Sequence, residues 1–279
     1  MAGPEPIHFE TDDVTLVGDI WQRQSAYGTV LLLQGGGQLR QTWTRTASHL
    51  HTAGWTVVTF DARGHGDSGW SASGDYSLDA FVGDIAAVAA ALPRQPVLVG
   101  ASLGGMAALI AQGERRLGRA LVLVDIVISP EVNGIARIAS LVADAPKKFP
   151  SLDQAAAYLR GPRAAGHSPG STNGLSRMFA RGPDGWWYWR VDRQVTNVVQ
   201  GLEPDRARRA AQAVHVPTLL VRGSNSDVVS EDGSTEFLRA VPHAHYVQVR
   251  GAGHLVVSEA NDVFCEYLAG FLDCLKPSR

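Results

Sequence analysis

The sequence predicts an α/β protein built on a mostly parallel, doubly wound sheet. Short apolar runs rich in β-branched residues alternate with segments of helical spacing. Several runs lack the polar alternation of a half-exposed strand, which is typical of central strands covered on both faces. Alternating strand and helix units of this length favour parallel pairing. The predicted central strands are Thr29–Leu33, Thr56–Phe60, Val97–Val99, Ala120–Val124, Thr218–Val221 and Tyr246–Val249.

The other elements of the predicted core follow from the same patterns. Two further runs, Ile7–Glu10 and Val14–Trp21, flank Thr11-Asp12-Asp13, which predicts an antiparallel hairpin at the sheet edge and brings the sheet to eight strands. Ser77 or Asp79 can cap the second helical segment. The predicted core helices are Thr42–Ala53, Leu78–Leu92, Leu103–Gln112, Ser234–Ala240 and Val257–Leu275.

One region interrupts the alternation of strands and helices. Residues 129–215 contain no convincing central strand, but have helix-like stretches, a Gly/Pro/Ser loop over 161–174 and the aromatic run Trp186–Trp189. We predict a core domain of residues 1–128 and 216–279 and a helical cap of residues 129–215. The cap follows the carboxyl end of a strand, so we expect it over the edge where open α/β sheets bind ligands. Its predicted helices are Ile135–Asp144, Leu152–Leu159 and Asp205–Ala213.

Composition excludes several classes of partner. The 25 basic and 27 acidic residues leave a formal charge of −2, which gives no sequence-wide attraction for nucleic acid or an anionic membrane. No apolar stretch approaches the ~20 residues of a membrane span, and residues 1–10 lack the features of a secretory signal. Cys265 and Cys274 are predicted on opposite faces of the last helix, too far apart to bridge. We therefore expect a cytoplasmic protein with reduced thiols.

The segment Gly100-Ala101-Ser102-Leu103-Gly104 carries the strongest chemical signal. It follows a predicted strand and opens a predicted helix, which is the context of a nucleophile elbow. The small residues allow strand and helix to pack closely around a strained serine, whose hydroxyl then stands at the positive end of a helix. The bland alternative is an ordinary glycine-rich turn. A serine also needs a base before it can attack.

A base and an acid follow in the order that the elbow requires. His254 comes after the last predicted strand, behind Gly251-Ala252-Gly253, and is the predicted general base. We assign Asp227, after the preceding strand, as the carboxylate that orients the imidazole. Asp125, at the end of the 120–124 strand, is the competing carboxylate. Asp232 fits less well because it would lie within the next helix.

The oxyanion hole needs two N–H donors. Leu103, directly after the nucleophile, is one candidate. Gly36 is the other, because it lies in the Gly35-Gly36-Gly37 turn that ends the 29–33 strand and has no side chain to obstruct its N–H. Alone, a triple glycine would be only a flexible loop. Because this triple glycine follows a central strand, we predict instead that it supplies an oxyanion donor.

Together these residues resemble the α/β-hydrolase fold superfamily, in particular its capped esterase, lipase and epoxide-hydrolase-like members. Asp61-Ala62-Arg63-Gly64-His65-Gly66-Asp67-Ser68 is similar to the family's Asp-x-Arg-Gly-x-Gly-x-Ser segment, and Gly251–His254 to its histidine loop. The resemblance covers Thr29–Leu275 and implies the α/β-hydrolase fold, with residues 129–215 as its variable cap. It also implies that His65 is structural. Gln34 stands where members usually have His.

The resemblance and the triad lead to a functional hypothesis. We expect a serine hydrolase that cleaves a carboxylic ester or lactone of a moderately hydrophobic small molecule through an acyl-enzyme on Ser102. Epoxide hydrolases and haloalkane dehalogenases of this fold use aspartate at that position, so the serine argues against both. The same triad also serves carbon–carbon bond hydrolysis, perhydrolysis and cofactor-free haloperoxidase activity. A non-catalytic ligand receptor on this fold is the third alternative.

Substrate contacts are the least determined part of the prediction. Trp186 and Trp187 are candidates for an apolar acyl or alcohol pocket, with Gln34 and Gly35 beside the oxyanion turn. The alternative is that the tryptophans anchor the cap on the core. We expect no cofactor and no metal, because neither His243/His245 nor His49/His51 has a third ligand at a recognisable spacing. Phosphate-binding loops are absent from the sequence.

Overall fold

The computed structural model describes residues 3–160 and 175–276, which form an eight-stranded sheet with helices on both faces and an insertion at one edge. The strand order is β1-β2-β4-β3-β5-β6-β9-β10. β1 pairs antiparallel with β2, and β2 with β4, while all other neighbours are parallel. The predicted sheet is confirmed. Its strands are β1 Glu5–Glu10, β2 Thr15–Trp21, β3 Thr29–Leu33, β4 Thr56–Phe60, β5 Val97–Ala101, β6 Ala120–Val124, β9 Thr218–Gly223 and β10 His245–Val249.

The central strands are buried along their whole length, as their unbroken apolar sequences predict. Every residue of β3, β4 and β6 is buried, and their bounds agree with the predicted ones. Parallel strands of one sheet end at the same edge, so the residues that follow β3, β5, β6, β9 and β10 converge there. That edge carries the site described below.

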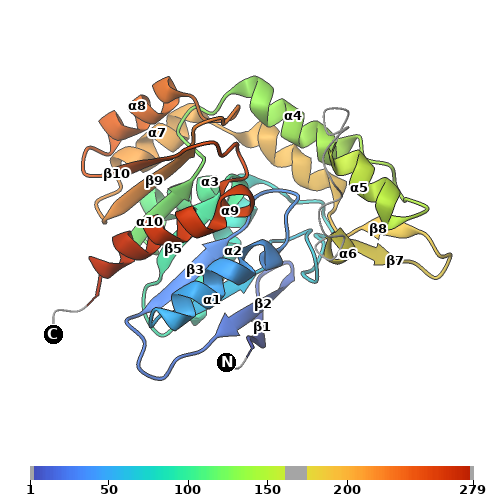
Figure 1. Ribbon diagram of the computed structural model, residues 1–279, viewed down its shortest axis with the longest axis horizontal. Coiled ribbons are helices and arrows are strands. Elements are labelled where there is room, and N and C mark those ends of the chain that lie inside the picture. The colour runs from blue at the N-terminus through green and yellow to red at the C-terminus, as the bar shows by residue number, and fades with distance from the viewer. Residues whose placement is uncertain (1–2, 161–174, 277–279) are drawn as a thin grey trace.

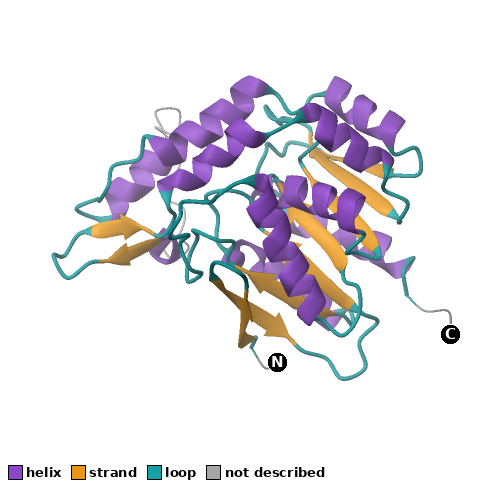
Figure 2. Ribbon diagram, turned by 180° about the vertical axis from the view of Figure 1, so that it is seen from behind, coloured by secondary structure: helices purple, strands orange, loops and turns teal. Residues whose placement is uncertain are grey.

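Two layers of helices cover the sheet, and the views in Figures 1 and 2 show them from opposite sides. α1, α9 and α10 form one apolar layer with the sheet, and α2, α3, α7 and α8 form the other. The Ser77 Oγ accepts a hydrogen bond from the Ala80 N–H at 3.2 Å, which confirms it as the N-cap of α2. The helices are η1 Arg40–Trp43, α1 Thr44–Thr52, α2 Leu78–Ala91, α3 Leu103–Arg115, α7 Pro204–Gln212, α8 Glu231–Ala240, α9 Val256–Glu259 and α10 Asn261–Asp273.

The insertion after β6 extends away from the sheet edge, with α4, α5 and a small hairpin in a row (Figure 1). Its helices were predicted in part, whereas the hairpin of β7 and β8, which belongs to a separate two-stranded sheet, was not. The predicted loop over 161–174 lies outside the described residues. The elements are α4 Val132–Ala143, α5 Leu152–Arg160, α6 Leu175–Met178, β7 Phe179–Arg181, β8 Trp187–Trp189 and η3 Arg193–Gly201.

The last helix of the predicted insertion, α7, packs on the core. A Cβ placed on Gly113 of α3 would lie 2.4 Å from the carbonyl oxygen of Ala210 in α7, so the two backbones are in direct contact. Ala207, Ala210 and Ala211 are buried in the same layer as α3. The division into core and cap stays a prediction, and this packing favours a boundary before Pro204 rather than at residue 215.

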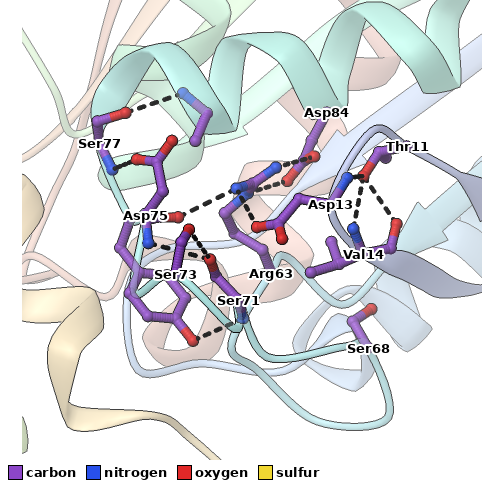
Figure 3. Close-up of polar contacts among 12 residues, drawn as sticks. Thr11, Asp13, Val14, Arg63, Ser68, Ser71, Ser73, Asp75, Ser77 and Asp84 are labelled. Carbon is purple, nitrogen blue, oxygen red and sulfur yellow. Dashed lines mark hydrogen bonds and ion pairs between the residues drawn. The ribbon is translucent and has the colours of Figure 1, made fainter.

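Arg63 joins α2, the segment before it and the turn between β1 and β2 (Figure 3). Its guanidinium donates two hydrogen bonds to Asp84 of α2, at 2.8 and 2.7 Å, and one to the carbonyl oxygen of Asp75 at 3.0 Å. It also contacts Asp13 in the turn between β1 and β2 at 3.4 Å. Burial would lower the pKa of Arg63, but its acidic partners raise it overall, so the guanidinium stays charged. The loop that follows β4 is thereby held in place.

The two cysteines do not pair, as predicted. Cys265 is buried and its Sγ lies 3.7 Å from the Thr46 Oγ1, while Cys274 is exposed. Within residues 3–160 and 175–276, no helix has both the length and the apolar character that crossing a membrane requires.

Candidate active site

Ser102 occupies the sharp turn between β5 and α3 that the sequence predicts. Its backbone has φ 49° and ψ −118°, a conformation that costs a non-glycine residue roughly 1–3 kcal/mol. The flanking glycines make the turn sterically feasible. A Cβ on Gly100 would lie 2.5 Å from the Gly104 carbonyl oxygen, and one on Gly104 would lie 2.5 Å from that of Gln34. The Gly-x-Ser-x-Gly pattern therefore has a structural cause at each glycine.

Backbone hydrogen bonds place the elbow between two neighbouring strands. The Ser102 N–H donates to the carbonyl oxygen of Val124, the last residue of β6, at 3.1 Å. On the other side, the Gly104 N–H donates to the carbonyl oxygen of Gln34 at 3.1 Å. The serine is thus fixed next to the residue that follows β6 and next to the turn that follows β3.

His254 forms its carboxylate contact with Asp125, the residue directly after β6. The His254 Nδ1–H donates to the Asp125 Oδ2 at 2.7 Å. Asp125 is fully buried, and the His254 side chain is only 5% exposed. A proton on Nδ1 leaves Nε2 free to accept one. The structure therefore brings together an imidazole and a carboxylate in the arrangement that orients a general base.

The prediction that Asp227 orients His254 is wrong. The Asp227 carboxylate accepts two hydrogen bonds from Arg137 of α4, at 2.6 and 2.9 Å, and this contact lowers the pKa of Asp227. Both aspartates follow neighbouring parallel strands, so the sequence alone could not rank them by geometry. Asp125 has a positive φ of 52° and its Oδ1 accepts the Gly223 N–H at 2.8 Å, which turns the carboxylate toward the end of β9. The one signal in the sequence was that Asp125 follows its strand directly.

The glycine turn after β3 leaves one backbone donor free. The Gly35 N–H donates to the Gln38 Oε1 at 3.1 Å, and the Gly37 N–H donates to the His65 Nε2 at 3.0 Å. Among the described residues, no acceptor is found for the Gly36 N–H. The Leu103 N–H lies in the first turn of α3, where no intrahelical acceptor exists. A Cβ on Gly36 would lie 3.5 Å from the Leu103 Cδ2, so the two predicted donors belong to adjoining segments.

Gln34 and Gly35 serve this turn rather than a binding cavity. Gln34 is buried, and its Nε2 donates to the Gln38 carbonyl oxygen at 2.6 Å, while its Oε1 is buried without a partner. Neither Gln34 nor Gly35 is among the residues that line the cavity described below. Their prediction as substrate-binding residues is therefore not supported by their positions. Gln34 closes the turn across its base.

His65 is fully buried and supports the same turn. Its Nδ1–H donates to the Arg63 carbonyl oxygen at 2.9 Å, so its Nε2 is the acceptor for the Gly37 N–H. Burial lowers the pKa of His65, and the neutral form that results is the one able to accept this bond. The contacts agree with the structural role expected for His65.

An apolar cavity opens onto Ser102 between the core and the cap. Its lining is mostly apolar, which suits the apolar part of a small molecule. The core contributes Ser102, the two predicted oxyanion residues and Ile126. The cap contributes η3 and one face of α4, namely Ile135, Ile138, Ala139 and Val142. The sequence analysis missed these four residues, although their spacing within a predicted helix marks an apolar stripe.

Trp186 and Trp187 are not among the residues that line this cavity, so the structure does not support their assignment to a substrate pocket. Trp187 exchanges two backbone hydrogen bonds with Phe149, both 2.8 Å, and the Trp186 ring lies 4.6 Å from the Lys148 Nζ. Trp189 packs against both the apolar cluster of the cap and the main core. Trp187 and Trp189 thus pack against the cluster that contains Phe149 and Phe179, while Trp186 and Tyr188, on alternate positions of the run, are exposed.

Within the part of the chain that the structure describes, no group of three or more His, Cys, Asp or Glu side chains is placed to hold a metal ion.

Comparison with known sequences finds relatives along most of the chain. The sequence model of the alpha/beta hydrolase family matches residues 30–267. The esterase Rv0045c of Mycobacterium tuberculosis is 32% identical over 259 residues, which cover 88% of this chain and 82% of that protein. The 2-(acetamidomethylene)succinate hydrolase of Mesorhizobium japonicum is 27% identical over 230 residues, covering 78% of this chain and 79% of the relative.

Solved structures share the fold over nearly the full length. A structure of E-2-(acetamidomethylene)succinate hydrolase has a TM-score of 0.83 at 22% identity and covers 97% of this chain and 99% of that one. A structure of the M. tuberculosis esterase Rv0045c has a TM-score of 0.77 at 25% identity, with 98% and 93% covered.

Proposed function

Since this chain belongs to the alpha/beta hydrolase family, we propose that it is a serine esterase that cleaves a carboxylic ester or lactone of a moderately hydrophobic small molecule. The observation that carries the proposal is the 2.7 Å hydrogen bond from His254 to the buried Asp125, next to the strand end that binds the Ser102 backbone. The M. tuberculosis relative named an esterase supports the reaction class. The apolar cavity supports the character of the substrate.

The proposed mechanism gives each of these residues a role. The His254 Nε2 removes the proton from the Ser102 Oγ, which attacks the ester carbonyl carbon, and Asp125 stabilises the imidazolium that forms. The N–H groups of Gly36 and Leu103 bind the oxyanion, and donors of this kind contribute roughly 3–4 kcal/mol each to transition-state stabilisation. His254 then protonates the leaving alcohol oxygen. A water molecule, activated by the same imidazole, hydrolyses the acyl-enzyme and restores Ser102.

Labelling with a fluorophosphonate probe followed by peptide mapping tests this proposal. We expect one modified residue, Ser102, and loss of labelling in Ser102→Ala and in His254→Ala. The variant Ser25→Ala, at an exposed serine outside the site, is the matched control and should label like the parent protein. Folded protein that does not react with the probe, or that still hydrolyses activated esters at the parent rate as Ser102→Ala, would refute the mechanism.

A further inference from the structure

The cavity reaches Ser102 from one side only. Among the described residues, its lining includes Ser102 and both predicted oxyanion donors, Gly36 and Leu103. It includes no residue of the loop over 251–255 that carries His254. The cavity therefore lies on the oxyanion side of the nucleophile, and the imidazole lies outside it.

This asymmetry distinguishes the two halves of an ester. The alcohol oxygen must come within hydrogen-bond reach of the His254 Nε2, because that atom returns the proton to the leaving group. The acyl half stays on Ser102 with its carbonyl oxygen at the oxyanion donors. A group inside the cavity is next to those donors and away from the imidazole, which is the position of the acyl half.

The lining also limits the chemistry of that acyl half. The cap side of the cavity is aliphatic, from Ile135, Ile138 and Val142 of α4 to Val198 of η3 and Leu202, the residue after η3. The one polar side chain among the lining residues on the cap side is Thr196, and its hydroxyl already donates a hydrogen bond to the Arg193 carbonyl oxygen at 2.8 Å. No charged side chain lines the cavity within the described part of the chain. A carboxylate or ammonium on the acyl chain would lose its hydration and gain no partner.

We propose that the cavity between the core, α4 and η3 is an acyl site that selects uncharged aliphatic acyl chains, with the alcohol half held outside it. The proposal rests on the esterase function proposed above. Ala139 has the smallest side chain that α4 contributes to the lining, so it is the position where added volume shortens the site.

The test compares kcat/KM across two series of esters. In the first, p-nitrophenol is constant and the acyl group runs from acetate through butyrate, hexanoate and octanoate to decanoate. In the second, hexanoate is constant and the alcohol varies. The proteins are the parent, Ala139→Leu and Ala136→Leu, the last being the same substitution on the exposed face of α4. p-Nitrophenyl hydrogen succinate, an anionic acyl group, completes the panel.

We expect kcat/KM of the parent to rise at least about tenfold from acetate to hexanoate, since each buried methylene contributes to binding. Ala139→Leu should reduce kcat/KM for the longest efficient acyl chain by at least about tenfold and leave acetate within about twofold. The effect of Ala139→Leu should not depend on the alcohol, and Ala136→Leu should match the parent. The succinate ester should be at least about a hundredfold poorer than butyrate.

Several outcomes would refute the proposal that the cavity is an acyl site. An effect of Ala139→Leu that follows the alcohol and not the acyl chain would assign the cavity to the alcohol half. A flat acyl series, or succinate cleaved as fast as butyrate, would refute the selectivity while Ser102-dependent hydrolysis still supported the esterase function. Absence of Ser102-dependent hydrolysis for every ester would refute both proposals. If Ala139→Leu does not fold, Ile138→Ala tests the same site, because it enlarges the cavity and should raise kcat/KM for decanoate relative to hexanoate.

Discussion

At the scale of single residues, the carboxylate of Asp125 decides how the imidazole is held. It is fully buried and accepts hydrogen bonds from the Gly223 N–H, the Ser226 hydroxyl and the His254 Nδ1–H. A buried carboxylate needs such partners to offset its lost hydration. Because three donors fix both oxygens, the ring of His254 is held in one tautomer and one orientation.

Replacing Asp125 by Asn is expected to lower kcat by about 10³–10⁴-fold, because the amide favours the wrong tautomer of the imidazole. Asp227→Asn is the matched variant at the other carboxylate. It breaks a half-exposed ion pair with Arg137, which contributes at most about 1 kcal/mol to stability, and should leave kcat within about threefold. Steady-state hydrolysis of an activated ester measures both. A larger loss in Asp227→Asn than in Asp125→Asn would reverse the assignment of the acid.

His65 makes stability depend on pH. Its pKa is lowered in the folded protein by burial, so between that pKa and the ordinary value of 6.5 the unfolded chain binds a proton that the folded chain does not. The contribution of His65 is complete above pH 6.5 and is lost as the pH falls toward the folded pKa. The loss amounts to at most about 1.4 kcal/mol for each pH unit.

Urea unfolding at about pH 7.5 and about pH 5.5 tests this sign. The free energy of unfolding should fall less between these pH values in His65→Gln than in the parent, because glutamine does not titrate and its oxygen can still accept the Gly37 N–H. His8→Gln, on the exposed edge strand, is the control and should behave like the parent. An equal loss in the parent and in His65→Gln would show that His65 is not a source of the pH dependence.

At the scale of elements, the strand–turn–helix unit around Ser102 depends on close backbone contact. Gly104 lies against the backbone of two residues of the neighbouring segment, and a Cβ there would be 2.5 Å from the Gln34 carbonyl oxygen and 2.7 Å from that of Leu33. Backbone atoms cannot move aside as a flexible side chain can. The turn that carries Gly36 and the elbow that carries Ser102 are therefore positioned by one shared contact.

Gly104→Ala is expected to lower the free energy of unfolding by about 1–3 kcal/mol and to reduce kcat, because the added methyl group separates α3 from the glycine turn. Gly270→Ala is the control in the interior of α10, where a Cβ meets nothing within 4 Å. That substitution should raise the free energy of unfolding by about 0.5–1 kcal/mol. Thermal unfolding and ester hydrolysis measure the two quantities. Full activity and unchanged stability in Gly104→Ala would contradict the contact.

At the scale of the whole molecule, the insertion after β6 is attached to the core beside the glycine turn that follows β3. The Gly66 N–H donates to the Arg190 carbonyl oxygen at 2.7 Å, and the Asp192 N–H donates to the Gly64 carbonyl oxygen at 2.8 Å. The buried Tyr76 adds a hydrogen bond from its hydroxyl to the Asp192 Oδ2 at 2.7 Å. The loop after β4 thus contacts the cap on one side and the glycine turn, through His65, on the other.

Tyr76→Phe is expected to destabilise the protein by about 1–3 kcal/mol, since it removes a donor from the buried Asp192 and an acceptor from the Ser71 N–H. Hydrogen exchange should speed up first in residues 187–201, where the cap meets this loop. Tyr267→Phe, at an exposed tyrosine of α10, should change stability by less than about 0.5 kcal/mol. Equal stability of the two variants would show that this contact does not hold the cap.

The sequence by itself determined the fold and the sharp turn at Ser102. Buried parallel strands need unbroken apolar runs, so β3, β4 and β6 were predicted to the residue. The elbow needs small residues at fixed spacing from Ser102, so it too leaves a local pattern in the chain.

Only the tertiary structure decided which carboxylate meets His254 and which side chains line the cavity. Asp125 and Asp227 both follow strands that end at the same edge of the sheet. Their side chains point in different directions, because Asp125 has a positive φ whereas the Asp227 carboxylate is bound by Arg137 of α4. Trp186 was predicted to line the cavity, but the pairing of its neighbour Trp187 with Phe149 holds this run elsewhere in the insertion. The apolar stripe of α4, which was not predicted as a cavity wall, lines the cavity. A local pattern records the conformation of its own segment, whereas the direction of a side chain across a site depends on contacts between segments far apart in the sequence.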